Sequence, residues 1–200
     1  MQEDTLLIRR AQKGDAQAFE TLVAPYERKI YALCLRMLGN REDALDCAQE
    51  AMLRIWRAMG TYKKQASFST WSYRIATNTC LDLLRRKKVR PSISLDGLAE
   101  AGYLPADSQT GPEAMAESSA RKQALERGIA SLPEDLRAAI VLRDIQGFSY
   151  EEVAEVLRTP LGTVKSRINR AREKLRKLLY PDGELFGTEA VYTNERRKDA

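Results

Sequence analysis

Histidine is absent from the 200 residues of the chain. This absence excludes Ser-His-Asp and Cys-His catalysis, a histidine general base and histidine-ligated zinc. Aromatic residues are also few, at 7% of the sequence. Leu, Ala, Arg, Glu and Lys dominate instead, and these residues favour helices. Because no segment alternates apolar and polar residues in the manner of a strand, we expect an all-α protein.

Cysteines are scarce and widely separated: Cys34, Cys47 and Cys80. Their odd number, and the lack of a C-x-x-C pair, favour reduced thiols packed in or near the core of a cytoplasmic protein over a redox or metal site. No stretch approaches the roughly 20 apolar residues of a membrane-spanning helix. The charged N-terminal segment lacks the apolar core of a signal peptide. We therefore expect no cofactor, no metal and no membrane insertion.

Proline and glycine divide the chain into segments. Between residues 89 and 119 the sequence carries three prolines, three glycines and several serines without sustained periodicity, which predicts a flexible linker. Helical patterns precede it over 1–88 and follow it over 120–179, and the tail 180–200 has no strong pattern. The sequence thus predicts two small helical domains on a flexible tether.

Within the first domain, three local signals predict where helices begin and end. Asp15 is a suitable N-cap for a helix beginning near Ala16. Pro25 is expected to break or kink that helix, because proline lacks the N–H and clashes with the preceding turn. Ser69 is expected to cap a long helix that ends near Lys88.

The segment from Ser149 to Leu178 predicts two helices joined by a tight turn. Ser149 and Glu152 form a capping box at the start of the first helix. Thr159 is expected to cap the second helix, with Pro160 at its first position. On a helical projection one narrow stripe of the second helix is apolar: Val164, Ile168, Ala171, Leu175 and Leu178.

The other face of this second helix is polar and basic. Lys165, Ser166, Asn169 and Arg170 project outward, and Arg167 and Arg172 flank the apolar stripe. Such side chains can read base edges, and flanking arginines suit phosphates. This pattern is typical of a helix-turn-helix whose second helix enters the major groove. The alternative from spacing alone is an ordinary helical hairpin with a basic solvated face.

The same segment resembles a known family. LPEDLRAAIVLRDIQGFSYEEVAEVL followed by TPLGTVKSRINRAREKL is similar to region 4 of sigma-70-type factors, and the GTVKSR…RAREKL string is typical of the extracytoplasmic-function (ECF) group. The resemblance implies that Lys165, Ser166, Asn169 and Arg170 read the −35 promoter element. Arg167 and Arg172 match positions that support the phosphate backbone.

An acidic face distinguishes the predicted helix over 41–59. Taken alone, this face is either plainly solvated or a dock for a basic protein surface. DALDCAQEAMLRIW resembles sigma region 2.2, whose helix binds the β′ clamp coiled coil of RNA polymerase. Asp46, Gln49 and Glu50 match the D-x-x-Q-E core of that motif. With Asp43 and Leu53 they form the expected polymerase-binding set.

A second DNA site is implied by FSTWSYRIATNTCLDLLRRKK, which resembles regions 2.3–2.4. In the family this helix and the preceding loop engage the −10 element and hold a base flipped from the strand. The positions carried over are Lys64, Ser67, Phe68, Ser69, Trp71, Arg74, Asn78, Arg85 and Arg86. Core packing is an equally good interpretation of Trp71. Asp82 points toward the same face and is expected to pair with Arg85 or Arg86.

Together these features predict a non-enzymatic ECF sigma factor. The expected partners are promoter DNA and core RNA polymerase, through its β′ clamp and β flap, and the family is often restrained by an anti-sigma factor. One alternative is a dimeric helix-turn-helix repressor or activator, which leaves the D-x-x-Q-E helix unexplained. Another is a basic nuclease, whose metal would need clustered carboxylates.

Overall fold

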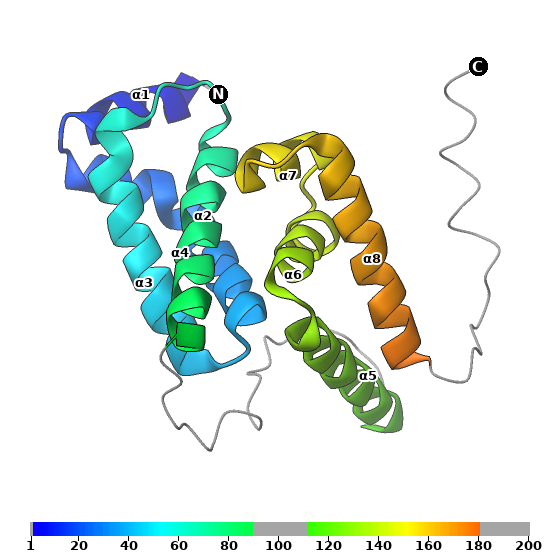
Figure 1. Ribbon diagram of the computed structural model, residues 1–200. Coiled ribbons are helices and arrows are strands. Elements are labelled where there is room, and N and C mark those ends of the chain that lie inside the picture. The colour runs from blue at the N-terminus through cyan, green and yellow to red at the C-terminus, as the bar shows by residue number, and fades with distance from the viewer. Residues whose placement is uncertain (1, 90–111, 181–200) are drawn as a thin grey trace.

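The computed structural model describes residues 2–89 and 112–180 of the chain, and within these residues every regular element is helical. The predicted all-α class and its division into two helical parts are therefore confirmed (Figure 1). The first part contains α1 (Gln2–Gln12), α2 (Ala16–Leu38), α3 (Arg41–Ala58), the short 3₁₀ helix η1 (Met59–Thr61) and α4 (Phe68–Val89). The second contains α5 (Pro112–Ser131), α6 (Glu134–Ile140), the π-helical turn η2 (Val141–Ile145), α7 (Tyr150–Leu157) and α8 (Leu161–Leu179).

The boundaries of the first part follow from local capping. The Asp15 carboxylate accepts a hydrogen bond from the Ala18 N–H at 3.0 Å, as predicted for an N-cap. Gly39 ends α2 with a φ of 80°, a left-handed conformation that glycine adopts without strain. Asn40 then caps α3 by accepting from the Asp43 N–H at 2.8 Å.

Pro25 was expected to break or kink its helix, and the break does not occur. Helix α2 runs continuously from Ala16 to Leu38 with Pro25 inside it. Both Pro25 and Thr21, the residue four positions earlier, are exposed, so the carbonyl that proline leaves without a donor faces solvent. Apolar side chains before and after the proline, including Leu22 and Ile30, are buried in the same core and anchor both halves of the helix.

The start of α4 also differs from the expectation. Ser67, and not Ser69, caps this helix: the Ser67 hydroxyl accepts from the Thr70 N–H at 3.0 Å. The Ser67 carbonyl accepts the first helical bond, from the Trp71 N–H at 3.0 Å. Two serines on either side of Phe68 made the sequence signal ambiguous, and burial of Phe68 in the core selects the earlier one.

In the second part, α7 and α8 form the predicted helix-turn-helix. The capping box is present, with Ser149 and Glu152 exchanging hydrogen bonds at 2.8 and 3.1 Å. The cap of α8, in contrast, was wrongly assigned. The Thr159 hydroxyl donates back to the Leu157 carbonyl instead of capping α8, and Pro160 occupies the N-cap position without a side-chain bond. Helix α5 begins at Pro112, within the segment predicted as linker, whereas 90–111 and the tail beyond Tyr180 lie outside the described residues.

The two parts are packed against each other in the structure. Helix α4 contacts α7, and α2 contacts α5, α6 and η2 (Figure 1). The rings of Tyr73 and Phe148 meet edge to face with centroids 4.7 Å apart, and the Tyr73 hydroxyl donates to Gln146 at 2.9 Å. A single cluster of buried apolar residues extends through both parts. Among the described helices, none is both long and apolar enough to span a bilayer.

The buried Arg137 of α6 joins helix ends from both parts. Its guanidinium donates to the Met37 carbonyl near the end of α2, and to the carbonyls of Ala130 and Leu132 near the end of α5. The last carbonyls of a helix lack intrahelical donors and carry the negative end of its dipole. Arg137 therefore serves as a shared C-terminal cap for two helices.

Candidate functional site

Helix α8 presents a polar, basic face to solvent. Its opposite side is buried through Val164, Ile168, Ala171 and Leu175, which confirms most of the predicted apolar stripe. Leu178, the last predicted member, is 52% exposed although it lies against Gly128 of α5. Among the side chains predicted to read base edges, Lys165, Asn169 and Arg170 are exposed and Ser166 is half-buried. The structure thus brings these donors and acceptors together on one open surface.

The two arginines that flank this face already have partners within the protein. Arg172 forms a two-pronged contact with Asp144 at 2.9 and 2.7 Å, and this hydrogen-bonded carboxylate raises the pKa of the guanidinium. The π-helical turn η2 contains Asp144. Arg167 contacts Asp135 at 3.3 Å and the Thr159 hydroxyl at 3.4 Å. Both arginines therefore fix the orientation of α8 before any contact with phosphate.

The predicted −10 residues divide into two groups by burial. Lys64, Ser67, Asn78, Arg85 and Arg86 are exposed, and Ser69 and Arg74 are half-buried. Lys64 lies in the left-handed region with a φ of 58° at the turn before α4. In contrast, Phe68 and Trp71 are buried, with 7% and 6% exposure.

Phe68 and Trp71 belong to an aromatic cluster beneath this surface. Their ring centroids lie 5.7 Å apart, and the Tyr62 ring lies 5.7 Å from Phe68 and 5.1 Å from Trp71. Tyr26 packs on Phe68 from α2 at 5.5 Å. In this conformation Trp71 therefore packs in the core, which is one of the two interpretations that the sequence allowed. The cluster supports the loop that carries Lys64 and Ser67.

Asp82 has a partner that the sequence did not predict. Its carboxylate lies 3.2 Å from Arg54 of α3 and 3.6 Å from Arg85. Arg54 also contacts Glu50 at 2.7 Å, so an ion-pair network links α3 to α4. Asp82 therefore neutralises basic groups beside the predicted −10 surface.

The acidic face of α3 is likewise divided. Asp43 pairs with Lys87 and Asn40, and Glu50 pairs with Arg54, so both carboxylates are engaged within the protein. Asp46, Gln49 and Leu53 are exposed, Leu53 at 49%. The predicted polymerase-binding set thus consists of three open side chains and two that tie α3 to its surroundings.

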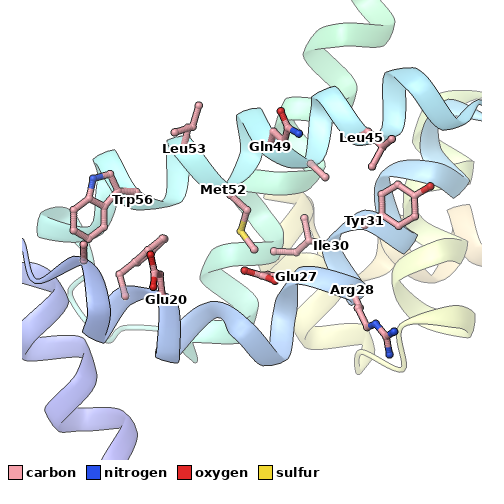
Figure 2. Close-up of a pocket in the computed structure, with 13 residues that line it drawn as sticks. Glu20, Glu27, Arg28, Ile30, Tyr31, Leu45, Gln49, Met52, Leu53 and Trp56 are labelled. Carbon is pink, nitrogen blue, oxygen red and sulfur yellow. The ribbon is translucent and has the colours of Figure 1, made fainter.

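An open apolar groove of about 810 Å³ lies between α2 and α3, next to these exposed residues. Figure 2 shows Met52 reaching from α3 toward Ile30 and Glu27 of α2, with Leu45, Gln49 and Leu53 along the α3 side. Glu20 and Glu27 add carboxylates to the α2 side. The sequence predicted Gln49 and Leu53 of α3 as binding residues but did not predict the contribution of α2. The helical spacing of Glu20, Glu27 and Tyr31, which places them on one face of α2, was the available signal.

Models of known protein families match both helical parts of the chain. The model for "Sigma-70 region 2" matches residues 22–90, and that for "Sigma-70, region 4" matches residues 122–175. The chain is an ECF sigma factor of the sigma-70 family. It is 40% identical to the ECF RNA polymerase sigma-E factor of Escherichia coli (strain K12) over 89% of this chain and 95% of that one. It is 42% identical to the ECF sigma factor SigW of Bacillus subtilis (strain 168), over 86% and 94%.

Among solved structures, the sigma factor is similar to CnrH in complex with the cytosolic domain of CnrY. The TM-score is 0.64 at 28% identity, over 90% of this chain and 99% of CnrH. Membership of the family establishes the function: the sigma factor directs promoter-specific transcription initiation by RNA polymerase and is not an enzyme. Promoter DNA and core polymerase are the partners of sigma factors generally.

Proposed function

We propose that this sigma factor reads the −35 element through the exposed face of α8. The observation that carries the proposal is the asymmetry of that helix: four apolar side chains are fully or nearly buried on one side, whereas Lys165, Asn169 and Arg170 are open on the other. Arg172 and Arg167 hold the helix in place through Asp144 and Asp135. Their proposed role on phosphates requires at least part of these ion pairs to be exchanged.

The −10 element is proposed to contact the exposed residues of α4 and its preceding loop. Arg74, Asn78, Arg85 and Arg86 supply donors along α4, and Lys64 and Ser67 supply them from the loop. Phe68 and Trp71 lie directly beneath, so a flipped base would gain an apolar wall only if these rings become more exposed. We assign them a supporting role in the described conformation.

The α2–α3 groove is the proposed polymerase-binding site. Its apolar lining, with exposed Leu45 and Leu53, suits the apolar side chains of a partner helix. Glu20 and Glu27 line the groove together with one cation, Arg28, and Asp46 is exposed on α3; these carboxylates suit a basic partner. The β′ clamp coiled coil is the partner that the family implies, with the β flap as the proposed contact of the second part.

The decisive experiment combines the full chain with core RNA polymerase and templates randomised around −35 and −10. We expect transcripts that depend on the sigma factor and are enriched for one pair of elements. Combining Lys165→Ala with Arg170→Ala should reduce −35 selection roughly 10- to 100-fold while holoenzyme formation is retained. Lys174→Ala with Arg176→Ala is the matched control on exposed basic residues of the same helix. Failure to bind core polymerase, or an equal effect of the two pairs, would contradict the assignment.

The groove is tested separately with Leu53→Asp. A charge at this exposed apolar position should weaken core binding at least 10-fold without unfolding the protein. Leu6→Asp is the control, because Leu6 is also exposed, at 60%, but lies on α1. Normal core affinity of Leu53→Asp would place the polymerase contact elsewhere.

Two further expectations rest on similarity. CnrH was solved with the cytosolic domain of CnrY, and we propose that an anti-sigma factor likewise restrains this sigma factor. Such a partner would compete with core polymerase, which is measured by adding core to the preformed complex and following transcript formation. Because the template and polymerase are cytoplasmic, we also propose a cytoplasmic location.

A further inference from the structure

The three cysteines of the chain meet in the core of the first part. Cys34 comes from α2, Cys47 from α3 and Cys80 from α4. The Cys80 sulfur lies 3.6 Å from that of Cys47 and 3.6 Å from that of Cys34, and all three sulfurs lie within 4.8 Å of one another. All are free thiols with 0–3% exposure. Cys47 lies 13 residues after Cys34 and 33 residues before Cys80, so no local sequence pattern predicts that the three meet.

The spacing of the sulfurs fits a shared cation. With metal–sulfur bonds of about 2.3 Å, sulfurs around one ion lie about 3.8 Å apart at tetrahedral angles and about 4.0 Å apart in a trigonal plane. The observed contacts of 3.6 Å therefore need to open by only a few tenths of an ångström. A disulfide requires about 2.05 Å, so one pair would have to close by about 1.5 Å inside a packed core. Metal binding thus demands less rearrangement than oxidation.

The donor set determines which cation would fit. The three sulfurs are soft ligands, which select thiophilic ions such as Cu(I) over Mg²⁺ or Ca²⁺. Structural zinc takes four protein ligands, and among the described residues no histidine or carboxylate joins this group. A thiophilic ion that accepts three sulfur ligands meets these conditions.

We propose that Cys34, Cys47 and Cys80 form a three-sulfur site for Cu(I). Binding places one Cu(I) between the sulfurs, and the thiol protons that it displaces leave to solvent, with no change of oxidation state. The ion links α2, α3 and α4 at a point directly beside Asp46, on the helix that borders the proposed polymerase groove. It therefore stabilises the two helices that border the groove, α2 and α3, and joins them to α4.

The test titrates the reduced full chain, without oxygen, with Cu(I) held by the chelator bicinchoninate. We expect the protein to remove one equivalent of copper, and the midpoint of thermal unfolding to rise by about 5 °C or more. Cys34→Ala, Cys47→Ala and Cys80→Ala should each lower the affinity at least 100-fold. Thr77→Val is the matched control, because Thr77 is equally buried on α4, one turn before Cys80, and its hydroxyl has no partner among the described residues.

Circular dichroism establishes that each variant is folded. If an alanine variant does not fold, X-ray absorption of the copper-loaded native chain decides the coordination, and about three sulfur neighbours at about 2.3 Å are expected. No transfer of copper from the chelator, more than one equivalent bound, or tighter binding of Zn²⁺ than of Cu(I) would overturn the proposal. Unchanged affinity in the cysteine variants, or nitrogen and oxygen neighbours only, would do so as well.

Discussion

Replacing Arg137 with methionine removes the shared cap of α2 and α5 while keeping a long apolar stem. Arg137 is 9% exposed, and its guanidinium donates to the carbonyls of Met37, Ala130 and Leu132. A hydrogen bond from a charged donor contributes about 1.5–3 kcal/mol. The variant loses three such bonds but also the cost of burying the guanidinium, whose pKa is lowered by that burial. We expect a net loss of about 3 kcal/mol.

Urea unfolding followed by circular dichroism measures this loss. Arg127→Met is the control, because Arg127 is an exposed arginine on α5, and it should change stability by about 0.5 kcal/mol or less. The bond to Met37 crosses between the two parts, so Arg137→Met should also increase protease cleavage between them. A variant as stable as the control would refute the capping role of Arg137.

Three other changes test separate interactions. Ile168→Ala leaves a cavity at a fully buried position of α8 and should lower the free energy of unfolding, measured by urea denaturation, by about 2–5 kcal/mol. A loss below about 1 kcal/mol would contradict tight packing around Ile168. Tyr73→Phe removes the 2.9 Å hydrogen bond to Gln146 and should destabilise the contact between the two parts by about 1 kcal/mol. Proteolysis should then be faster, and an unchanged rate of proteolysis would argue against the contact in solution. Burial opposes ionisation of Asp43, but the hydrogen bonds from Lys87 and Asn40 together with the charge of Lys87 outweigh it and hold the pKa of Asp43 below its usual value. The stabilisation is therefore present above about pH 4 and lost as the pH falls, so acid should lower the thermal midpoint less in Lys87→Met than in the native chain.

Periodicity and capping signals predicted much of the fold. The capping box of Ser149 and the buried stripe of α8 depend on residues a few positions apart, so the sequence contains the information that they need. Pro25 misled the prediction because its effect depends on surroundings. Pro25 and Thr21, whose carbonyl the proline leaves without a donor, are both exposed, and buried apolar residues flank them on both sides.

The interactions that escaped prediction connect residues far apart in the chain. Arg137 and Met37 are separated by 100 positions, and Arg172 and Asp144 by 28. Neither pair has a local pattern, because their meeting depends on how helices pack. The same reason explains why Arg172 could be predicted as a DNA contact but not as the partner of an aspartate. Motif resemblance identifies positions, whereas ion pairs between helices depend on the folded geometry.

The packing of α7 against α4 has a consequence for any partner that needs these helices apart. Such a partner binds only the open fraction of molecules, so its apparent dissociation constant rises by the inverse of that fraction. If the contact around Tyr73 and Phe148 contributes about 2.8 kcal/mol, about one molecule in a hundred is open and the apparent affinity falls about 100-fold. A partner that accepts the packed arrangement carries no such penalty. The contact therefore weakens the apparent binding of partners that need α4 and α7 apart, and it leaves the binding of partners that accept the packed arrangement unchanged.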